Sequence, residues 1–207
     1  MKIKLTDKRP LLVFAHKGEA LAFFTHFKAV PLRLPSLERV NLFESRECLI
    51  LLTGEGRQEA QDKLVSVLPV LKNISMIINL GVAGALSPDL PVGSMAFIKK
   101  IFAEGEAPYQ CPDKMAQDQW ITADLFTADK RILDSSDARP LAKIAQLVDR
   151  EAYGLAIAAQ NFHLAFIALK VVSDLPWKKN DSDNQQKVQQ RAPDWSSLLL
   201  QSFTQLF

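Results

Sequence analysis

The sequence has few cysteines and few histidines, and both shortages narrow the classes of protein to which it can belong. Its two cysteines, Cys48 and Cys111, do not make a disulfide framework, so we expect a protein of the reducing cytoplasm. Its three histidines, His16, His26 and His163, have none of the spacings that zinc ligands show. We therefore expect no metal site and no bound cofactor.

The sequence also lacks an excess of charge of one sign and a long hydrophobic run. Its 25 lysines and arginines nearly balance 23 aspartates and glutamates, and the basic residues are scattered, which argues against nucleic-acid binding. The apolar stretch at residues 11–15 is too short for a secretory signal. The longest apolar run elsewhere, residues 163–172, contains Lys170 and is about half of a membrane span. We expect a soluble protein with neither nucleic acid nor membrane as a partner.

What remains is the composition of an ordinary globular protein. The 207 residues are 48% hydrophobic and 23% charged, which suits a single domain over residues 1–207. Short β-branched runs alternate with segments of helical periodicity. This alternation predicts an α/β protein in which helices cover a sheet.

The periodicity assigns most of the chain to strands or helices. Strands are expected at residues 11–15, 40–47, 48–52, 76–80, 92–102 and 163–173. Helices are expected at residues 19–27, 58–71, 140–161 and 195–206, the last with Asp194 as its cap. Residues 103–139 have a weak pattern, and we expect loops there with one or two short elements. Residues 178–193 are polar, and we expect them to be mobile.

Four short motifs lie at or beside the ends of the expected strands, where open α/β sheets bind ligands. The first strand leads into Ala15-His16-Lys17-Gly18-Glu19, and the middle strand into Asn79-Leu80-Gly81-Val82-Ala83-Gly84, of which we expect Gly81 to Gly84 to form a turn. A helical segment contains Val148-Asp149-Arg150-Glu151-Ala152, and the last strand ends at Val172-Ser173-Asp174. Taken singly, these residues are explained by ordinary roles as caps, turn formers or solvated helix positions.

Together and in this order, the motifs resemble the nucleosidase branch of the nucleoside phosphorylase and methylthioadenosine/adenosylhomocysteine nucleosidase superfamily. That branch has Ala-x-x-x-Glu after its first strand and Asn-x-Gly-x-Ala-Gly after its middle strand, followed by a Val-Gly turn that Val92-Gly93 matches. Its ribose-binding segment reads Val-Glu-Met-Glu-Ala, and its catalytic strand ends in Ile-Ser-Asp. The resemblance spans residues 11–205 and implies a three-layer α/β/α domain with a central mixed, twisted sheet.

The resemblance also implies roles for the matched residues. Asp174 corresponds to the general acid that protonates or hydrogen-bonds N7 of a purine, and Glu19 to the base that activates water at C1′ of the sugar. Glu151 corresponds to the carboxylate that binds the ribose hydroxyls. Ala83, Gly84 and Ser173 fall among the substrate-binding positions. These are the acid and base that cleavage of a glycosidic bond requires.

Two further positions depart from the family pattern or leave it open. Arg150 stands where the family has a methionine that packs on the sugar, so it either contacts an anion of the substrate or turns out of the pocket. The base-stacking segment Gly-Asp-x-Phe has two possible registers, Ala123-Asp124-Leu125-Phe126 and Ala128-Asp129-Lys130-Arg131. We favour the first because Phe126 supplies an aromatic ring, although core packing explains Phe126 nearly as well.

Hydrolysis of a purine nucleoside is the reaction that the resemblance favours, and two alternatives stay open. The first is phosphorolysis, with inorganic phosphate as co-substrate and with Lys17, Gly18 and Arg57 recruited to bind it. The arginine found near Asn79 in many phosphorylases is missing here. The second is a nucleoside-binding protein without turnover, which Arg150 makes conceivable. The resemblance further implies a homodimer or higher homo-oligomer.

Overall fold

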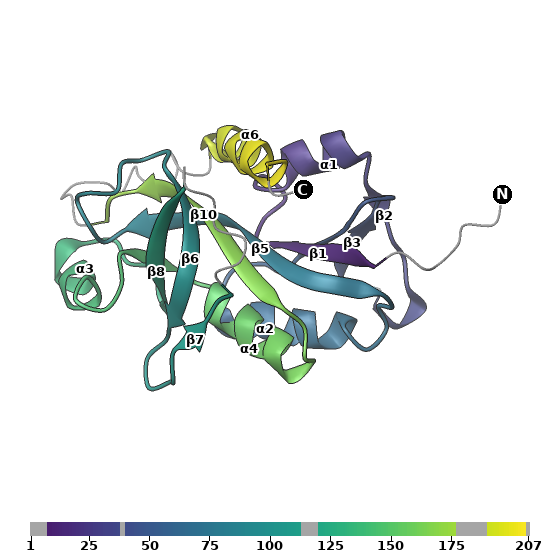
Figure 1. Ribbon diagram of the computed structural model, residues 1–207, viewed down its shortest axis with the longest axis horizontal. Coiled ribbons are helices and arrows are strands. Elements are labelled where there is room, and N and C mark those ends of the chain that lie inside the picture. The colour runs from purple at the N-terminus through teal and green to yellow at the C-terminus, as the bar shows by residue number, and fades with distance from the viewer. Residues whose placement is uncertain (1–7, 38–39, 113–119, 177–189, 206–207) are drawn as a thin grey trace.

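The structure, a computed structural model, describes residues 8–37, 40–112, 120–176 and 190–205. Most of the polar segment 178–193, for which mobility is expected, lies outside the described residues. In Figure 1 a twisted sheet runs through the middle of the molecule, with helices on both of its faces. This is the three-layer α/β/α arrangement with a mixed sheet that the resemblance implied, and the structure confirms it.

The strands of this sheet come from the whole length of the chain. Their bounds are β1 Arg9–Phe14, β2 Val30–Pro31, β3 Asn41–Glu44, β4 Leu49–Leu52, β5 Ile74–Ala85, β6 Met95–Phe102, β7 Tyr109–Gln110, β8 Ile121–Thr127, β9 Leu147–Asp149 and β10 Phe166–Asp174. Their order is β10-β6-β8-β9-β5-β1-β4-β3-β2, with β7 paired to β6. Because β10 also pairs with β5, the five strands β5, β10, β6, β8 and β9 form a closed ring. Strands β1 to β4 extend the sheet outside that ring.

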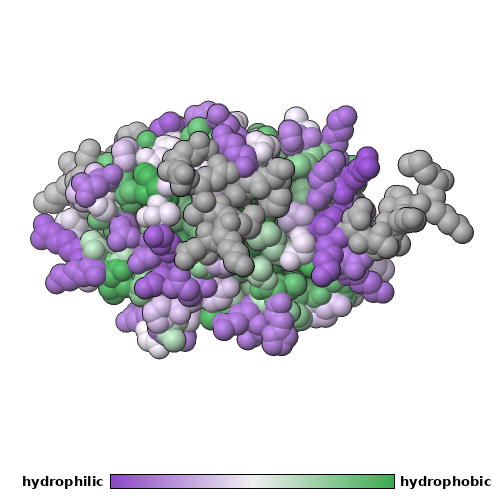
Figure 2. All heavy atoms as spheres, viewed as in Figure 1, coloured by the Kyte–Doolittle hydropathy of each residue, from purple (hydrophilic) through white to green (hydrophobic). Residues whose placement is uncertain are grey.

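Helices cover the two faces of the sheet in pairs. One face carries α1 (Leu21–Phe27) and α6 (Ala192–Phe203), and the other carries α2 (Arg57–Val67) and α4 (Ala152–Asn161). The alternation of side chains along β1 explains the two layers. Leu11 and Val13 pack in the core below α2 and α4, whereas Leu12 and Phe14 pack in the core below α1 and α6. Hydrophilic side chains are spread over much of the described surface seen in Figure 2, with hydrophobic ones between them.

The pair formed by α2 and α4 depends on one close approach of the backbone. Gly154 of α4 lies against the carbonyl oxygen of Arg57 at the start of α2, and a Cβ built on Gly154 would lie 2.3 Å from that oxygen. Only glycine fits this contact without a shift of one helix. The contact places the start of α4, and hence Glu151 just before it, close to the turn that precedes α2.

Three sequence expectations are wrong. Residues 140–161 do not form one helix: α3 (Ser135–Leu141) ends there, β9 follows, and α4 begins only at Ala152. The three residues of β9 are too short to show a periodicity, and their strand is stabilised by pairing with β5 and β8 on either side. The weak segment 103–139 contains β8, an interior strand. Asp194 is not the cap of α6, which begins after Arg191.

The turn expected at residues 81–84 is also wrong, because these residues belong to a strand. Strand β5 continues through them to Ala85. Along one edge β10 stays paired with it, Lys170 with Gly81 and Asp174 with Gly84, while on the other edge β9 follows β1 and pairs Val148 with Gly84. Gly81 is needed for clearance rather than for a turn, since a Cβ there would lie 3.0 Å from the Glu19 carboxylate. The glycine-rich motif therefore marks a strand over which an acidic side chain lies.

Candidate active site at the strand ends

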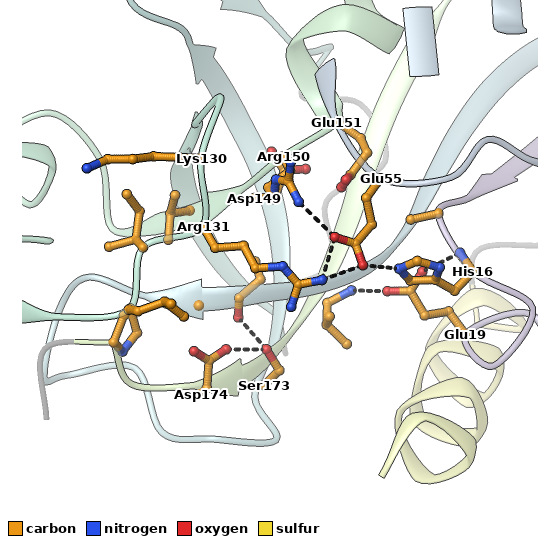
Figure 3. Close-up of a pocket in the computed structure, with 18 residues that line it drawn as sticks. His16, Glu19, Glu55, Lys130, Arg131, Asp149, Arg150, Glu151, Ser173 and Asp174 are labelled. Atoms are coloured by element: carbon orange, nitrogen blue, oxygen red, sulfur yellow. Dashed lines mark hydrogen bonds and ion pairs between the residues drawn. The ribbon is translucent and has the colours of Figure 1, made fainter. Parts of the chain in front are cut away.

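A cavity of about 180 Å³ lies beyond the carboxyl ends of β1, β5 and β10 and beside the start of α4. Figure 3 shows the side chains that line it. They come from segments far apart in the sequence: Ala15, His16, Glu19, Glu55, Val82, Ala83, Gly84, Lys130, Arg131, Ile132, Leu133, Val148, Asp149, Arg150, Glu151, Ser173, Asp174 and Pro176. The three acidic residues to which the resemblance gave roles, Glu19, Glu151 and Asp174, are all among them.

Glu19 is held with its carboxylate directly over β5. Its Oε1 accepts a hydrogen bond from the backbone N–H of Val82 at 3.0 Å, and its Oε2 accepts one from the N–H of His16 at 3.3 Å. The side chain is only 6% exposed, and its orientation is fixed by the backbone of β5 and of the segment that follows β1. A buried carboxylate fixed in this way is pre-organised to accept a proton from a group in the cavity.

Glu151 lies just before α4 and is fixed by the turn on the other side of the cavity. Its Oε1 accepts a hydrogen bond from the N–H of Gly56 at 2.9 Å. Burial, together with the neighbouring Asp149 carboxylate, raises the pKa of Glu151 to about 7, against the opposing effects of Lys170 and the Gly56 N–H. Glu151 therefore changes its charge near neutral pH.

This raised pKa predicts a pH dependence of stability. Between the ordinary value of 4.5 and about 7, the folded protein keeps a proton on Glu151 that the unfolded chain has lost, so this group makes the protein less stable as the pH rises through that window. We expect Glu151→Gln, which cannot ionise, to gain stability relative to wild type across the same window, with the gain levelling off above it. Urea denaturation at pH values from about 5 to about 8 measures this difference.

The control for that experiment is Glu47→Gln, because Glu47 is an exposed glutamate away from the cavity. Its stability relative to wild type should show no comparable trend. A Glu151→Gln difference that is the same at every pH would contradict a raised pKa at this position.

A buried ion pair supports the floor of the cavity. Lys170 Nζ lies 2.8 Å from Asp149 Oδ2, and the two side chains are 2% and 1% exposed. Asp149 also accepts hydrogen bonds from the Thr127 hydroxyl at 2.7 Å and from the Ala152 N–H at 3.1 Å. Burial alone would lower the pKa of Lys170, but Asp149 and Glu151 outweigh it and raise that pKa. Lys170 is thus a fixed positive charge beneath several acidic groups.

Asp174 and Ser173 lie at the opposite end of the cavity from His16 and Glu19 (Figure 3). The Ser173 hydroxyl lies 2.6 Å from Asp174 Oδ1 and also 3.3 Å from the carbonyl oxygen of Ala83. Asp174 ends β10, where the ladder shifts register between Val172 and Asp174. The two acidic groups proposed by the resemblance for acid and base therefore face one cavity from its two ends.

A charged cluster that was not predicted from the sequence crosses the middle of the cavity. We call it the Glu55 cluster, and it consists of Glu55, Arg131, Arg150 and His16. Arg131 Nη2 donates to both oxygens of Glu55, and Arg150 Nη1 donates to Oε2 at 2.7 Å. His16 Nε2 lies 2.7 Å from Glu55 Oε1. Burial raises the pKa of Glu55, but Arg131 and His16 outweigh this effect and hold it below its ordinary value. The signal in the sequence was a charged residue between two glycines, Gly54 and Gly56.

The sequence left two options for Arg150: contact with an anion of the substrate, or a side chain turned out of the pocket. The structure contradicts the second option. The Arg150 guanidinium points into the cavity, where it pairs with Glu55 and approaches the carbonyl oxygen of Asp129 at 3.5 Å. Its Nε is buried with no hydrogen-bond partner among the described residues. Arg150 thus lines the cavity instead of turning out of it.

Phe126 is the one residue of the expected site that does not line the cavity. The alternation along β8 explains this: Thr127 points towards Asp149, so Phe126 points to the other side, where it packs in a small core with Leu86 and Ala138. The register that reaches the cavity is the second one, through Lys130 and Arg131. Phe126 packs in that small core and lines a neighbouring cavity, which shares Lys130 and Ile132 with this one.

The residues considered for a phosphate site do not gather at the cavity. Lys17, Gly18 and Arg57 are absent from its lining. Arg57 pairs with Asp129 at 3.1 Å and with Glu106 at 3.8 Å, and Gly18 lies against Ala192, which a Cβ on Gly18 would meet at 2.9 Å. Within the described segments, no set of His, Cys, Asp and Glu side chains is arranged to hold a metal ion.

None of the helices in the described part of the chain has the length and apolar character needed to cross a membrane.

The arrangement of strands and helices is similar to that of solved nucleosidases. One similar structure is the adenosylhomocysteine nucleosidase of Streptococcus pyogenes, solved with 5-methylthiotubericidin. Its TM-score is 0.83 at 16% identity, and the match covers 99% of this chain and 98% of the nucleosidase chain. The methylthioadenosine/adenosylhomocysteine nucleosidase of S. pneumoniae, solved with the transition-state inhibitor MT-ImmA, has a TM-score of 0.82 at 13% identity, covering 96% and 97%.

A Helicobacter pylori futalosine hydrolase mutant has a TM-score of 0.78 at 14% identity, covering 97% of this chain and 100% of its own. No family model matches the sequence, and no curated protein matches it. The fold implied by the four motifs is therefore confirmed, at a sequence identity too low to carry an activity across.

Proposed function

We propose that this protein hydrolyses the N-glycosidic bond of a purine nucleoside. The observation that carries the proposal is the convergence of Glu19, Glu151 and Asp174, widely separated in sequence, on a single cavity. The fold supports it, because solved proteins of this fold include nucleosidases bound to nucleoside analogues. The resemblance gives each of the three acids a role that its place in the cavity permits.

In the proposed reaction, Asp174 donates a proton to N7 of the purine while the bond between C1′ and the base breaks. Glu19 accepts a proton from the water whose oxygen forms the new bond to C1′, so that the products are a free purine and a free sugar. Glu151 accepts hydrogen bonds from the ribose hydroxyls, which stabilises the positive charge that develops on the sugar. The acid and the base each contribute about 10² to 10⁴ in rate.

Water suits this cavity better as the nucleophile than phosphate does. The Glu19 carboxylate lies where the nucleophile is activated, and a phosphate dianion beside it would be repelled. The residues considered for a phosphate site lie outside the cavity lining, and Arg57 is already paired with acidic side chains. Assembly into a homo-oligomer stays a prediction.

The test is a panel of nucleosides incubated with the purified protein, with and without inorganic phosphate, and analysed by chromatography for free base and for the sugar product. Adenosine, methylthioadenosine, adenosylhomocysteine and a futalosine-type compound form the panel. We expect base release from at least one of them without phosphate. Release that requires phosphate and yields ribose 1-phosphate would replace hydrolysis by phosphorolysis. Binding without any base release would identify a protein that does not turn over.

A further inference from the structure

The Glu55 cluster has the composition of a binding site for an oxyanion, with Glu55 in the place of the ligand. Two guanidiniums and an imidazole converge on one carboxylate, and both of its oxygens are engaged. Planar guanidiniums bind carboxylate and phosphate groups through paired hydrogen bonds, so the same donors suit either. Two arginines facing one carboxylate also leave one positive charge without a counter-charge inside the cluster.

Glu55 is attached in a way that permits its displacement. It lies between Gly54 and Gly56, whose φ angles of +82° and +107° belong to glycine. Its side chain is one-quarter exposed, so a ligand that enters the cavity meets it directly. Arg131 and Arg150 are anchored separately, beyond β8 and just before α4, so neither belongs to the turn that carries Glu55.

The cluster extends from the middle of the cavity to His16, at the end where the sugar is expected. The backbone N–H of His16 binds Glu19, and the N–H of Gly56 binds Glu151, so both sugar-side acids are joined to residues of the cluster or its flanks. Asp174 lies at the other end (Figure 3). Among the described residues, the lining contains the two guanidiniums and no Phe, Tyr or Trp ring.

We propose that Arg131 and Arg150 select a nucleoside whose sugar carries an oxyanion, a phosphate or a carboxylate, which replaces Glu55 between the two guanidiniums. This inference rests on the proposed function for the placement of the sugar. A free phosphate is the weaker candidate, because it would lie between the guanidiniums and the Glu19 carboxylate without being held by a sugar.

The test uses adenosine and adenosine 5′-monophosphate as a matched pair of probes, with dissociation constants measured by calorimetry. We expect the monophosphate to bind at least about tenfold more tightly than adenosine, the effect of one charge-assisted hydrogen-bonded pair. Arg131→Met and Arg150→Met should each remove most of this preference, and Arg131→Lys should keep part of it. Glu55→Gln should strengthen monophosphate binding, because it removes the competing charge.

Arg9→Met is the matched control, since Arg9 is a half-buried arginine that pairs with Glu44 and the Ser45 carbonyl away from the cavity. The Arg9→Met variant should prefer the monophosphate over adenosine as strongly as wild type does. Thermal denaturation of every variant separates lost binding from lost folding, and Arg131→Lys keeps the test decisive if an Arg→Met protein does not fold.

Equal affinity for the two probes in both wild type and Glu55→Gln would overturn the proposal. So would inorganic phosphate binding as tightly as the monophosphate, because the anion would then be a free co-substrate. Free adenine is measured in the same samples. If binding depends on the arginines but no adenine is released, only the proposed hydrolysis is refuted. If adenine is released and the phosphate group makes no difference to that release, only this inference is refuted.

Discussion

Asp174→Asn is expected to lower kcat for base release by about 10² or more while the protein stays folded. The amide cannot donate the proton that the leaving base requires, so the loss falls on the chemical step. Folding should survive because the amide oxygen still accepts the hydrogen bond from the Ser173 hydroxyl, which lies 2.6 Å from the carboxylate in the wild type. Initial rates at saturating nucleoside, on the best substrate of the panel, measure the effect.

Asp89→Asn provides the control for a general effect of losing one negative charge. Asp89 lies on an exposed loop between β5 and β6, away from the cavity, and its variant should keep the wild-type rate. If Asp174→Asn also turned over at the wild-type rate, the assignment of Asp174 as the acid would be lost. The convergence of acids would then need another explanation.

Lys170→Met is expected to lower the free energy of unfolding by about 3–5 kcal/mol, the usual cost of breaking a buried ion pair from one side. Methionine fills a similar volume, so the loss comes from the Asp149 carboxylate, which stays buried without its counter-charge. Because Lys170 also opposes the rise in the pKa of Glu151, which is about 7 in the wild type, that pKa should rise further in the variant. Urea denaturation gives the stability, and the pH dependence of kcat/KM reports the pKa in the active enzyme.

Two variants separate the ion pair from other causes. Lys99→Met removes an exposed lysine from the neighbouring strand β6 and should change stability little. The double variant Lys170→Met/Asp149→Asn removes both charges and keeps a side-chain oxygen for the Thr127 hydroxyl, so it should recover most of the loss. A double variant that is destabilised by the sum of its single changes would show that the pair is not the cause.

The sequence was informative where local pattern and chemistry coincide. The buried runs that became β1, β4 and β10 are short, apolar and followed by polar residues, and their ends carry the acids of the cavity. Element boundaries near β9 were not readable, because its three residues owe their conformation to strands from elsewhere in the chain. The same holds for Gly81 to Ala85, where the pairing with β9 and β10 keeps a glycine-rich segment extended.

The charged cluster could not be read from the sequence for a related reason. Glu55 meets Arg131 and Arg150 across 76 and 95 residues of chain, and nothing local in the sequence pairs them. Arg150 was recognised as a departure from the family pattern, but its partner was not. Phe126 was favoured for its ring, and only the alternation of β8 shows that this ring points into the core.

The cavity has two parts that differ in how well they tolerate insertions and substitutions, because only one of them lies on the closed ring of five strands. Ala83 and Asp174, at the end of the cavity proposed for the purine, lie on ring strands, and every ring strand is hydrogen-bonded on both sides. Glu19 and Glu55 follow β1 and β4, which lie outside the ring. Insertions or substitutions after those two outer strands can therefore reshape the sugar side of the cavity over evolutionary time while the geometry at the base is retained.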